Sequence, residues 1–278
     1  HWDIIAQAVI EVRPGGDVPG RMRREPGGVA ANISRALAGF GADVSLVSAV
    51  SGDADGARLL ELVGAGGADC SRVLRTQPPS DTFVALETPD GELLAGVADC
   101  TGLESNADAL VADLLSSTED AVRTWVVDGN LPEAALTRLA EAQRQRTQPL
   151  AIVAASPAKA SRLARFLPVA SATLYCNRAE AEALADQSLP DAATAAAALR
   201  SRDGWSVLVT DGAHPAAWAD GDGLLTLSPA AITLRRATGA GDRLVAAHLL
   251  ARAQGRPPQE ALRAAIAAAA AHASGETP

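Results

Sequence analysis

Aromatic side chains are scarce in this chain of 278 residues, since phenylalanine, tyrosine and tryptophan together make up only 3% of it. A core that lacks aromatic rings must be filled by alanine, valine and leucine, so we expect its helices to pack closely. Hydrophobic residues still amount to 48%, which is ordinary for a globular protein. The length is sufficient for one large α/β core with a small appendage.

Cysteine is also rare. Only Cys70, Cys100 and Cys176 are present, and their spacing matches no metal-binding motif. An odd number of cysteines without a secreted-type pattern argues against a disulfide scaffold. The sequence therefore predicts reduced thiols in a cytoplasmic protein.

Long apolar runs are lacking too. The longest candidate, residues 261–273, is dominated by alanine and interrupted by Arg263 and His272, so we expect no transmembrane helix. No signal peptide is recognisable. The net charge of −9 argues against a general nucleic-acid or membrane-surface binder. It does not exclude a phosphate ligand, because backbone dipoles and a metal ion can outweigh the global field locally.

A glycine-rich segment before the last helices is the most informative feature that the chain does have. Residues 237–242 read Ala-Thr-Gly-Ala-Gly-Asp and lead into an alanine-rich helical stretch. Unpaired N–H groups and the helix dipole favour an anion there, so Gly239, Ala240 and Gly241 are candidate donors to a phosphate. Asp242 follows at once and could take the proton of an attacking hydroxyl, as phosphoryl transfer requires. A glycine turn with Asp242 as a helix cap fits the same residues.

A second glycine pair opens a helix early in the chain. Gly27 and Gly28 are followed by Val-Ala-Ala-Asn, which places Asn32 about one turn into the helix. Paired glycines let a polyol approach the backbone closely, and the amide of Asn32 offers hydroxyl groups both a donor and an acceptor. The pattern predicts a site for a sugar or a nucleoside.

Together these motifs resemble those of the ribokinase-like (PfkB) carbohydrate and nucleoside kinases, and the resemblance covers nearly the whole chain. The motifs in order are Gly-Gly-x-x-x-Asn at 27–32, Gly-Asp-x-x-Gly at 52–56, Asn-x-x-Glu at 177–180, Thr-x-Gly at 210–212 and Gly-Ala-Gly-Asp at 239–242. Their order and separation are more specific than any one of them.

The resemblance implies a ribokinase-like three-layer α/β/α sandwich with a mostly parallel central sheet and a small β lid. Strands that alternate with helices along the chain favour the same parallel sheet. We expect residues 1–278 to form a single kinase domain, with the lid built from insertions at about 4–27 and 71–99. The resemblance also implies a homodimer formed through the lid.

For the acceptor, the resemblance implies contacts from Gly27, Gly28, Asn32 and an acidic residue of the first strand. That residue is Asp3 if the strand ends there, in which case most of the strand lies before residue 1. In a second interpretation the strand is 4–12 and Glu11 takes the polar position. The resemblance makes Asp242 the general base, and Gly239, Ala240 and Gly241 the amides that stabilise the transferring phosphate.

For ATP, the resemblance implies that Asn177, Thr210 and Gly212 approach the nucleotide. It places Glu180 near Mg²⁺, through water, because Mg²⁺ keeps several of its waters. An ordinary first-turn helix pair and a strand end followed by a turn would account for these residues equally well.

Three segments depart from the family pattern. Arg236 and Ala237 replace an acidic or amide residue and a threonine, and the replaced carboxylate often helps to bind a monovalent cation. A requirement for such a cation is therefore left open, and the guanidinium of Arg236 could supply its charge instead. Arg243 and Leu244 replace a small residue and a phenylalanine, and 153–155 reads Val-Ala-Ala in place of an Asp-Pro element.

We therefore expect an ATP- and Mg²⁺-dependent kinase that phosphorylates a primary, 5′-type hydroxyl of a nucleoside or sugar. Several segments resemble pseudouridine kinases and favour pseudouridine as the acceptor: 20–28, 98–99, 128–133 and 156–159. Two alternatives stay open. One is a ribokinase- or fructokinase-like sugar kinase, and the other is a sugar- or nucleoside-binding homologue that has lost catalysis.

Overall fold

The structure is a computed structural model that describes residues 1–77, 79–116, 124–146, 148–166, 172–200 and 205–276. Its contacts divide the chain into two compact units. The first unit comprises His1–Asn106, Ile232–Leu250 and Ala267–Pro278, and the second comprises Ala107–Ala231 and Ala251–Ile266.

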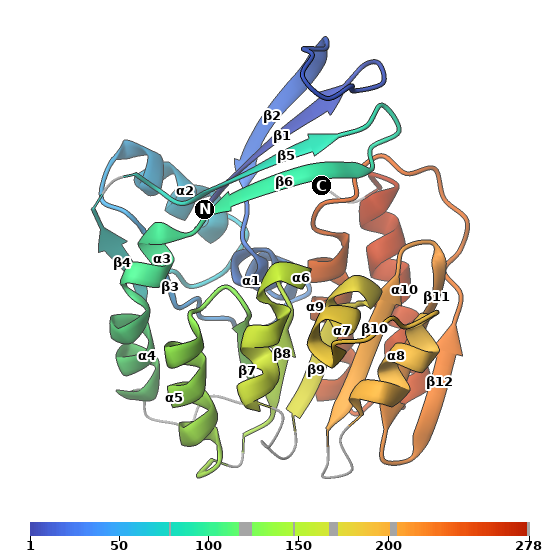
Figure 1. Cartoon of the computed structure of the whole chain (residues 1–278). Coiled ribbons are helices and arrows are strands. Elements are labelled where there is room, and N and C mark those ends of the chain that lie inside the picture. The colour runs from blue at the N-terminus through green and yellow to red at the C-terminus, as the bar shows by residue number, and fades with distance from the viewer. Residues whose placement is uncertain (78, 117–123, 147, 167–171, 201–204, 277–278) are drawn as a thin grey trace. The chain divides into compact units, whose positions relative to one another are not determined.

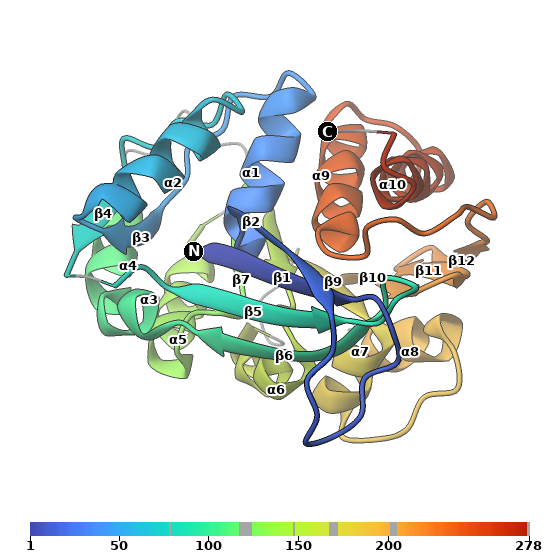
Figure 2. The same ribbon diagram turned by 90° about the horizontal axis from the view of Figure 1, so that it is seen from above.

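A four-stranded sheet of order β2-β1-β5-β6 dominates the first unit (Figure 1). Its strands are β1 (Trp2–Ala8), β2 (Gly20–Pro26), β5 (Thr82–Glu87) and β6 (Leu93–Asp99). Figure 2 shows these strands side by side, with β1 parallel to β5 and antiparallel to β2. The Thr-Pro-Asp-Gly turn at 88–91 joins β5 to β6, as its turn residues predict.

One face of this sheet collects charged side chains. Asp3 lies opposite Glu25, and Ile5 lies opposite both Arg23 and Ala85. Because side chains alternate along a strand, Glu87 shares the face of Ala85. The two predicted insertions thus supply all four strands, although β1 ends at Ala8 and not at residue 12.

The rest of the first unit's N-terminal part connects the strands. Helix α1 (Val29–Gly39) follows β2, with Gly28 as its N-cap. Strand β3 (Ser48–Ser51), helix α2 (Ala54–Gly64) and strand β4 (Val73–Thr76) come next, and helix α3 (Thr101–Ser105) follows β6. The Asp53 carboxylate caps α2 by accepting a 2.9 Å hydrogen bond from the Gly56 amide.

The sequence predicts a parallel core strand at 44–50, and this prediction is only partly right. The strand begins at Ser48, and Ser45 forms only an isolated bridge with Asp69. Its parallel partner is β4, and the two form a separate two-stranded sheet.

The second unit is built on a six-stranded sheet of order β12-β11-β10-β9-β8-β7. The strands β7 to β10 are parallel, and β11 and β12 extend the sheet antiparallel, which confirms a mostly parallel sheet. Their bounds are Trp125–Asp128, Leu150–Val153, Ala172–Asn177, Ser206–Asp211, His214–Asp220 and Gly223–Leu227.

Helices accompany these strands in the alternating order that the sequence predicts. They are α4 (Ala107–Ser116), α5 (Glu133–Gln143), α6 (Pro157–Ala160) with the 3₁₀ turn Ser161–Phe166, α7 (Arg178–Ala185) and α8 (Ala192–Leu199). Two long helices, α9 (Ala240–Ala253) and α10 (Pro258–Ala273), contribute to both units.

Alanine fills much of the second unit's core, as the scarcity of aromatics predicts. Ala181, Ala195 and Ala196 are fully buried in one cluster with Leu136, Ile152 and other aliphatic side chains. Among the helices that the structure describes, none has the length and apolarity needed to cross a bilayer.

Candidate functional site

Asp242 lies in the first turn of α9, in the first unit. The side-chain amide of Asn32 donates a 2.8 Å hydrogen bond to its Oδ2. This bond joins two predicted motifs that are 210 residues apart in the sequence. It fixes the orientation of the carboxylate that the sequence predicts to be the general base.

Asp3 and Gly27 are in direct contact beside this pair. The Asp3 side chain passes so close to the Gly27 backbone that a Cβ at that position would overlap its carboxylate. Asp3 is buried on β1, whereas Glu11 is exposed beyond the end of that strand. The structure thus brings Asp3, and not Glu11, to the glycine pair.

The loop before α9 is held by His272 of α10. The Nε2 atom of His272 lies 3.0 Å from the carbonyl oxygen of Thr238 and donates to it in the Nε2-protonated tautomer. Gly239 follows with φ = +86°, and a Cβ there would lie only 3.1 Å from His272 Nε2. Glycine is therefore required by the backbone and by the imidazole together. The sequence alone suggests no such role for His272.

The amides of the loop are partly engaged. The N–H of Arg243 donates to the Gly239 carbonyl at 3.0 Å, and that of Ala240 makes a longer 3.3 Å turn bond to Ala237. The first N–H groups of a helix have no acceptor within the helix. The segment from Gly239 to Asp242 lies at the start of α9, where the sequence predicts an anion site.

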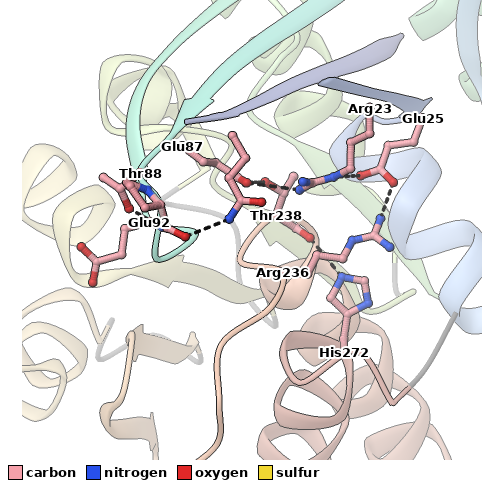
Figure 3. Close-up of polar contacts among 10 residues, drawn as sticks. Arg23, Glu25, Glu87, Thr88, Glu92, Arg236, Thr238 and His272 are labelled. Atoms are coloured by element: carbon pink, nitrogen blue, oxygen red, sulfur yellow. Dashed lines mark hydrogen bonds and ion pairs between the residues drawn. The ribbon is translucent and has the colours of Figure 1, made fainter. Parts of the chain in front are cut away.

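A polar network connects the charged face of the four-stranded sheet to this loop (Figure 3). Glu87 has only 2% of its surface exposed, and it accepts a 3.3 Å bond from Arg23 and a 3.4 Å bond from the Thr238 hydroxyl. Arg236 forms a 2.9 Å ion pair with Glu25. The basic run at 20–28 therefore contributes internal ion pairs, which sequence reasoning does not reveal.

A small cavity of about 40 Å³ adjoins these residues. Its lining includes Asp3, Glu25, Asn32, Arg35, Arg236, Thr238, Gly239, Arg243 and His272. All of them belong to the first unit.

The predicted ATP-binding residues meet in the second unit. Asn177 ends β9 and lies opposite Thr210 near the end of β10, and Gly212 follows with φ = +57°. Arg178 Nε donates to Asp211 Oδ1 at 3.0 Å and ties the two strand ends together. These residues lie at the carboxyl ends of adjacent parallel strands, where open α/β sheets bind their ligands.

Asn177 and Glu180 form a reciprocal capping box at the start of α7. The Asn177 side chain accepts from the Glu180 N–H at 2.9 Å, and Glu180 Oε2 accepts from the Asn177 N–H at 2.8 Å. Burial raises the pKa of Glu180 to about 7, and the bond from Asn177 opposes this shift only in part. A nearby cation would favour the ionised form of this carboxylate.

Glu180 is a suitable group for Mg²⁺, which binds through one or two carboxylates together with substrate phosphates and water. Among the described residues, no three His, Cys, Asp or Glu side chains gather into a metal-binding cluster. The donor set thus fits an ion held largely by waters and phosphates better than one held in an all-protein cage.

Two further segments that the sequence analysis singles out meet in the second unit. The Nζ atom of Lys159 donates a 2.8 Å hydrogen bond to Asn130 Oδ1, and Arg162 reaches the backbone carbonyl of Asn130 at 3.3 Å. The N–H of Asn130 in turn donates to Asp128 Oδ1 at 2.8 Å. Lys159 is therefore engaged with the turn that follows β7.

Comparison with known proteins agrees with these motifs. The model of the pfkB family carbohydrate kinases matches residues 3–276. A curated relative, the uncharacterized sugar kinase YeiI of Escherichia coli (strain K12), is 31% identical over 140 residues. That match covers 49% of this chain and 38% of the relative.

Solved structures share the fold over nearly the whole chain. A carbohydrate kinase from Agrobacterium tumefaciens superposes with a TM-score of 0.76 at 29% identity, covering 97% of this chain and 87% of its own. Ribokinase from Cryptococcus neoformans var. grubii superposes with a TM-score of 0.78 at 21% identity, and the match covers 98% of this chain and 90% of the ribokinase chain. Phosphofructokinase-2 from Escherichia coli superposes with a TM-score of 0.80 at 20% identity, and the match covers 98% of this chain and 89% of the phosphofructokinase chain.

The chain belongs to the pfkB family of carbohydrate kinases and has the ribokinase-like α/β fold. This membership classes it with the phosphotransferases that use a hydroxyl group as acceptor.

Proposed function

We propose that this protein is an ATP-dependent kinase that phosphorylates a primary, 5′-type hydroxyl of a nucleoside or sugar. The observation that carries the proposal is the 2.8 Å hydrogen bond between Asn32 and Asp242. It places the proposed general base beside a residue of the predicted acceptor motif. Asp3 and Gly27, in contact with each other beside it, support an acceptor site at this point of the first unit.

In this proposal Asp242 removes the proton of the acceptor hydroxyl, and the oxygen attacks the γ-phosphorus of ATP. The bond from that phosphorus to the bridging oxygen breaks, and ADP leaves with the electron pair. The amides of Gly239, Ala240 and Gly241 stabilise the charge on the transferring group. A positioned general base contributes about 10²- to 10⁴-fold to the rate.

For ATP we propose contacts from Asn177, Thr210 and Gly212, and for Mg²⁺ a contact from Glu180 through water. Their position at the ends of β9 and β10 supports this assignment. Bound Mg²⁺ would neutralise charge on the phosphates. The requirement for a monovalent cation stays open, because Arg236 replaces the carboxylate of the family pattern.

Pseudouridine is the acceptor that we favour, and pseudouridine 5′-phosphate would be the product. The support is the resemblance of segments 20–28, 98–99, 128–133 and 156–159 to pseudouridine kinases. A ribokinase- or fructokinase-like activity on a free sugar is the second candidate, and membership in a family of carbohydrate kinases supports it. We further propose that the insertions at 4–27 and 71–99 act as a lid over the acceptor within one kinase domain.

ATP consumption with Mg²⁺ should be measured against pseudouridine, uridine, other nucleosides, ribose and fructose. The Asp242→Asn variant tests the base, and Asp55→Asn is the matched control, since Asp55 is exposed and pairs with Arg24 on the surface. We expect turnover of one acceptor that disappears in Asp242→Asn and persists in Asp55→Asn.

The acceptor panel separates the candidate functions. Turnover of pseudouridine alone supports the nucleoside assignment, and turnover of a free sugar replaces it with the second candidate. If the folded protein is stabilised thermally by an acceptor yet turns over none of them, it is a binding protein and the kinase proposal is wrong.

A further inference from the structure

The cavity in the first unit is surrounded by an excess of positive charge. The guanidinium groups of Arg35, Arg236 and Arg243 line it, together with the imidazole of His272. Only two carboxylates, those of Asp3 and Glu25, line it as well. The chain as a whole carries a net charge of −9, so the charge of this cluster is opposite in sign to the net charge of the protein.

Each carboxylate has a nitrogen-bearing neighbour, and for Glu25 that neighbour is one of the three arginines that line the cavity. Glu25 pairs with Arg236 at 2.9 Å, and the His1 imidazole lies 3.0 Å from Asp3 Oδ1. Within the described part of the chain, Arg35 and Arg243 form no ion pair. Arg35 donates to the Pro26 carbonyl at 3.2 Å, and Arg243 lies over the Phe40 ring, with its guanidinium carbon 5.1 Å from the ring centre.

Two donor atoms of this cluster are buried without an acceptor among the described residues. They are Nε of Arg236 and Nε of Arg243. A buried guanidinium N–H without an acceptor is costly, since it has lost its water and gained nothing in exchange. An anion bound at this point would supply the missing acceptor.

The pKa shifts of Arg35 and His272 also indicate a positive potential in this cavity. Burial lowers the pKa of Arg35, and the charges of Arg236 and Arg243 lower it further against the opposing effect of Glu25. Burial likewise lowers the pKa of His272, and the same two arginines add to the shift. Both groups therefore experience a positive potential that an anion would relieve.

The size of the cavity is compatible with a small anion. A volume of 40 Å³ holds about three water-sized groups, which suits a compact oxyanion. Arginine forks match the oxygens of phosphate in paired hydrogen bonds. Gly239 and Asn32 also line the cavity, and Asn32 contacts Asp242 directly.

We propose that this cavity is an oxyanion site in which Arg35, Arg236 and Arg243 bind a phosphate-sized group beside Asp242. The phosphate is either free inorganic phosphate or a group carried by the acceptor or its product. Its use in phosphoryl transfer rests on the function proposed above, whereas its binding does not.

The test is calorimetric titration of the unmodified protein at constant ionic strength, without ATP. The probes are inorganic phosphate, ribose 5-phosphate and, as the neutral comparator, ribose. Saturable binding of inorganic phosphate identifies the free anion as the ligand. Binding of ribose 5-phosphate alone, and tighter than ribose, identifies a phosphate carried by the sugar. If neither phosphate probe binds, the proposal is wrong, whatever the kinase assay shows.

Variants localise the binding. Arg35→Gln and Arg243→Gln should each weaken phosphate binding by about tenfold or more. Arg58→Gln is the matched control, because Arg58 pairs with Glu61 on the exposed surface of α2 in the same unit. Arg243→Lys keeps the positive charge but loses the paired N–H donors of the guanidinium. It provides a milder change if Arg243→Gln does not fold. Binding unchanged in all the cavity variants would overturn the assignment.

Discussion

Glu180 is a buried carboxyl that caps α7 and that we propose to act near Mg²⁺. Its pKa is raised from 4.5 to about 7 by burial, so the native state favours the protonated form. The resulting stabilisation is fully present below pH 4.5 and is lost as the pH rises through about 7. Binding of Mg²⁺ near this group should therefore release a proton and strengthen with pH over the same interval.

Glu180→Gln should remove this pH dependence while keeping the capping box, because glutamine can accept the same backbone bond. Urea unfolding of both proteins between pH 4 and 8 measures the difference. We expect the variant to gain up to about 3 kcal/mol relative to the wild type across this range. Glu260 is exposed, so the stability difference between Glu260→Gln and the wild type should not change with pH. A flat difference for Glu180→Gln as well would contradict a raised pKa.

Arg236 carries a second prediction at this scale. Its guanidinium is held by Glu25 at 2.9 Å in the segment before Gly239. It supplies a permanent positive charge where the family pattern has a carboxylate associated with a monovalent cation. We expect turnover to be the same in K⁺, Na⁺ and tetramethylammonium salts at equal ionic strength. Clear activation by K⁺ would show that the guanidinium does not replace the cation.

Residue types alone could single out Asp242, Asn32 and the glycine motifs as candidates, because the chemistry that suggests them is local to each motif. They could not identify Glu87 or His272. Glu87 contacts Thr238 across 151 residues of sequence, and His272 sits in an alanine-rich helix with no polar pattern around it. Such roles arise only when the fold brings distant segments together.

At the scale of elements, prediction succeeded where periodicity and capping signals agree. The Asn-x-x-Glu pair at 177–180 starts α7, as a first-turn helix pair would, and the alanine-rich run at 261–273 lies within α10. Strand β2 was not foreseen, because Gly-Arg-Met-Arg-Arg-Glu-Pro has no apolar alternation and the strand lies at a sheet edge. Its pairing with β1, and not its composition, makes it a strand.

The start of α7 allows capping to be separated from nucleotide binding. Asn177→Ser should keep the cap, since serine is about as good an N-cap as asparagine. Its thermal midpoint should then stay close to that of the wild type. If the amide of Asn177 also contacts ATP, KM for ATP should rise while the acceptor KM is unchanged.

Two outcomes would contradict that prediction. An unchanged KM for ATP in a stable Asn177→Ser protein would make Asn177 a helix cap only. Asn177→Ala provides the reference, because loss of the cap should cost about 1 kcal/mol of unfolding free energy.

For the whole molecule, composition was a sound guide to the core and a poor guide to the site. Few aromatics predicted an alanine-rich core, and Ala195 and Ala196 are fully buried. The net charge of −9 says nothing of the cavity lined by Arg35, Arg236 and Arg243, because that cluster forms only in three dimensions. Global charge reports on solubility and steering, whereas local geometry decides what a site binds.

Exposed apolar side chains on the four-stranded sheet bear on the proposed dimer. Met22 is 80% exposed on β2 and Val97 is 72% exposed on β6, and Val97 lies opposite Val84 of β5. Strands β2 and β6 are the two edges of the sheet. Apolar residues gathered over several strands mark a surface suited to a partner, and a second copy of this chain is the partner that we propose.

The proposed dimer predicts a mass of twice 28.3 kDa by light scattering at micromolar concentration. Val97→Lys places a charge on the apolar surface, at the edge strand β6, so it should shift the protein to the monomer without unfolding it. Leu224→Lys is the control, since Leu224 is similarly apolar and exposed but lies on β12 of the second unit. A monomeric wild type at all concentrations would exclude the dimer. A dimer that persists in Val97→Lys would show that the dimer interface lies outside this sheet.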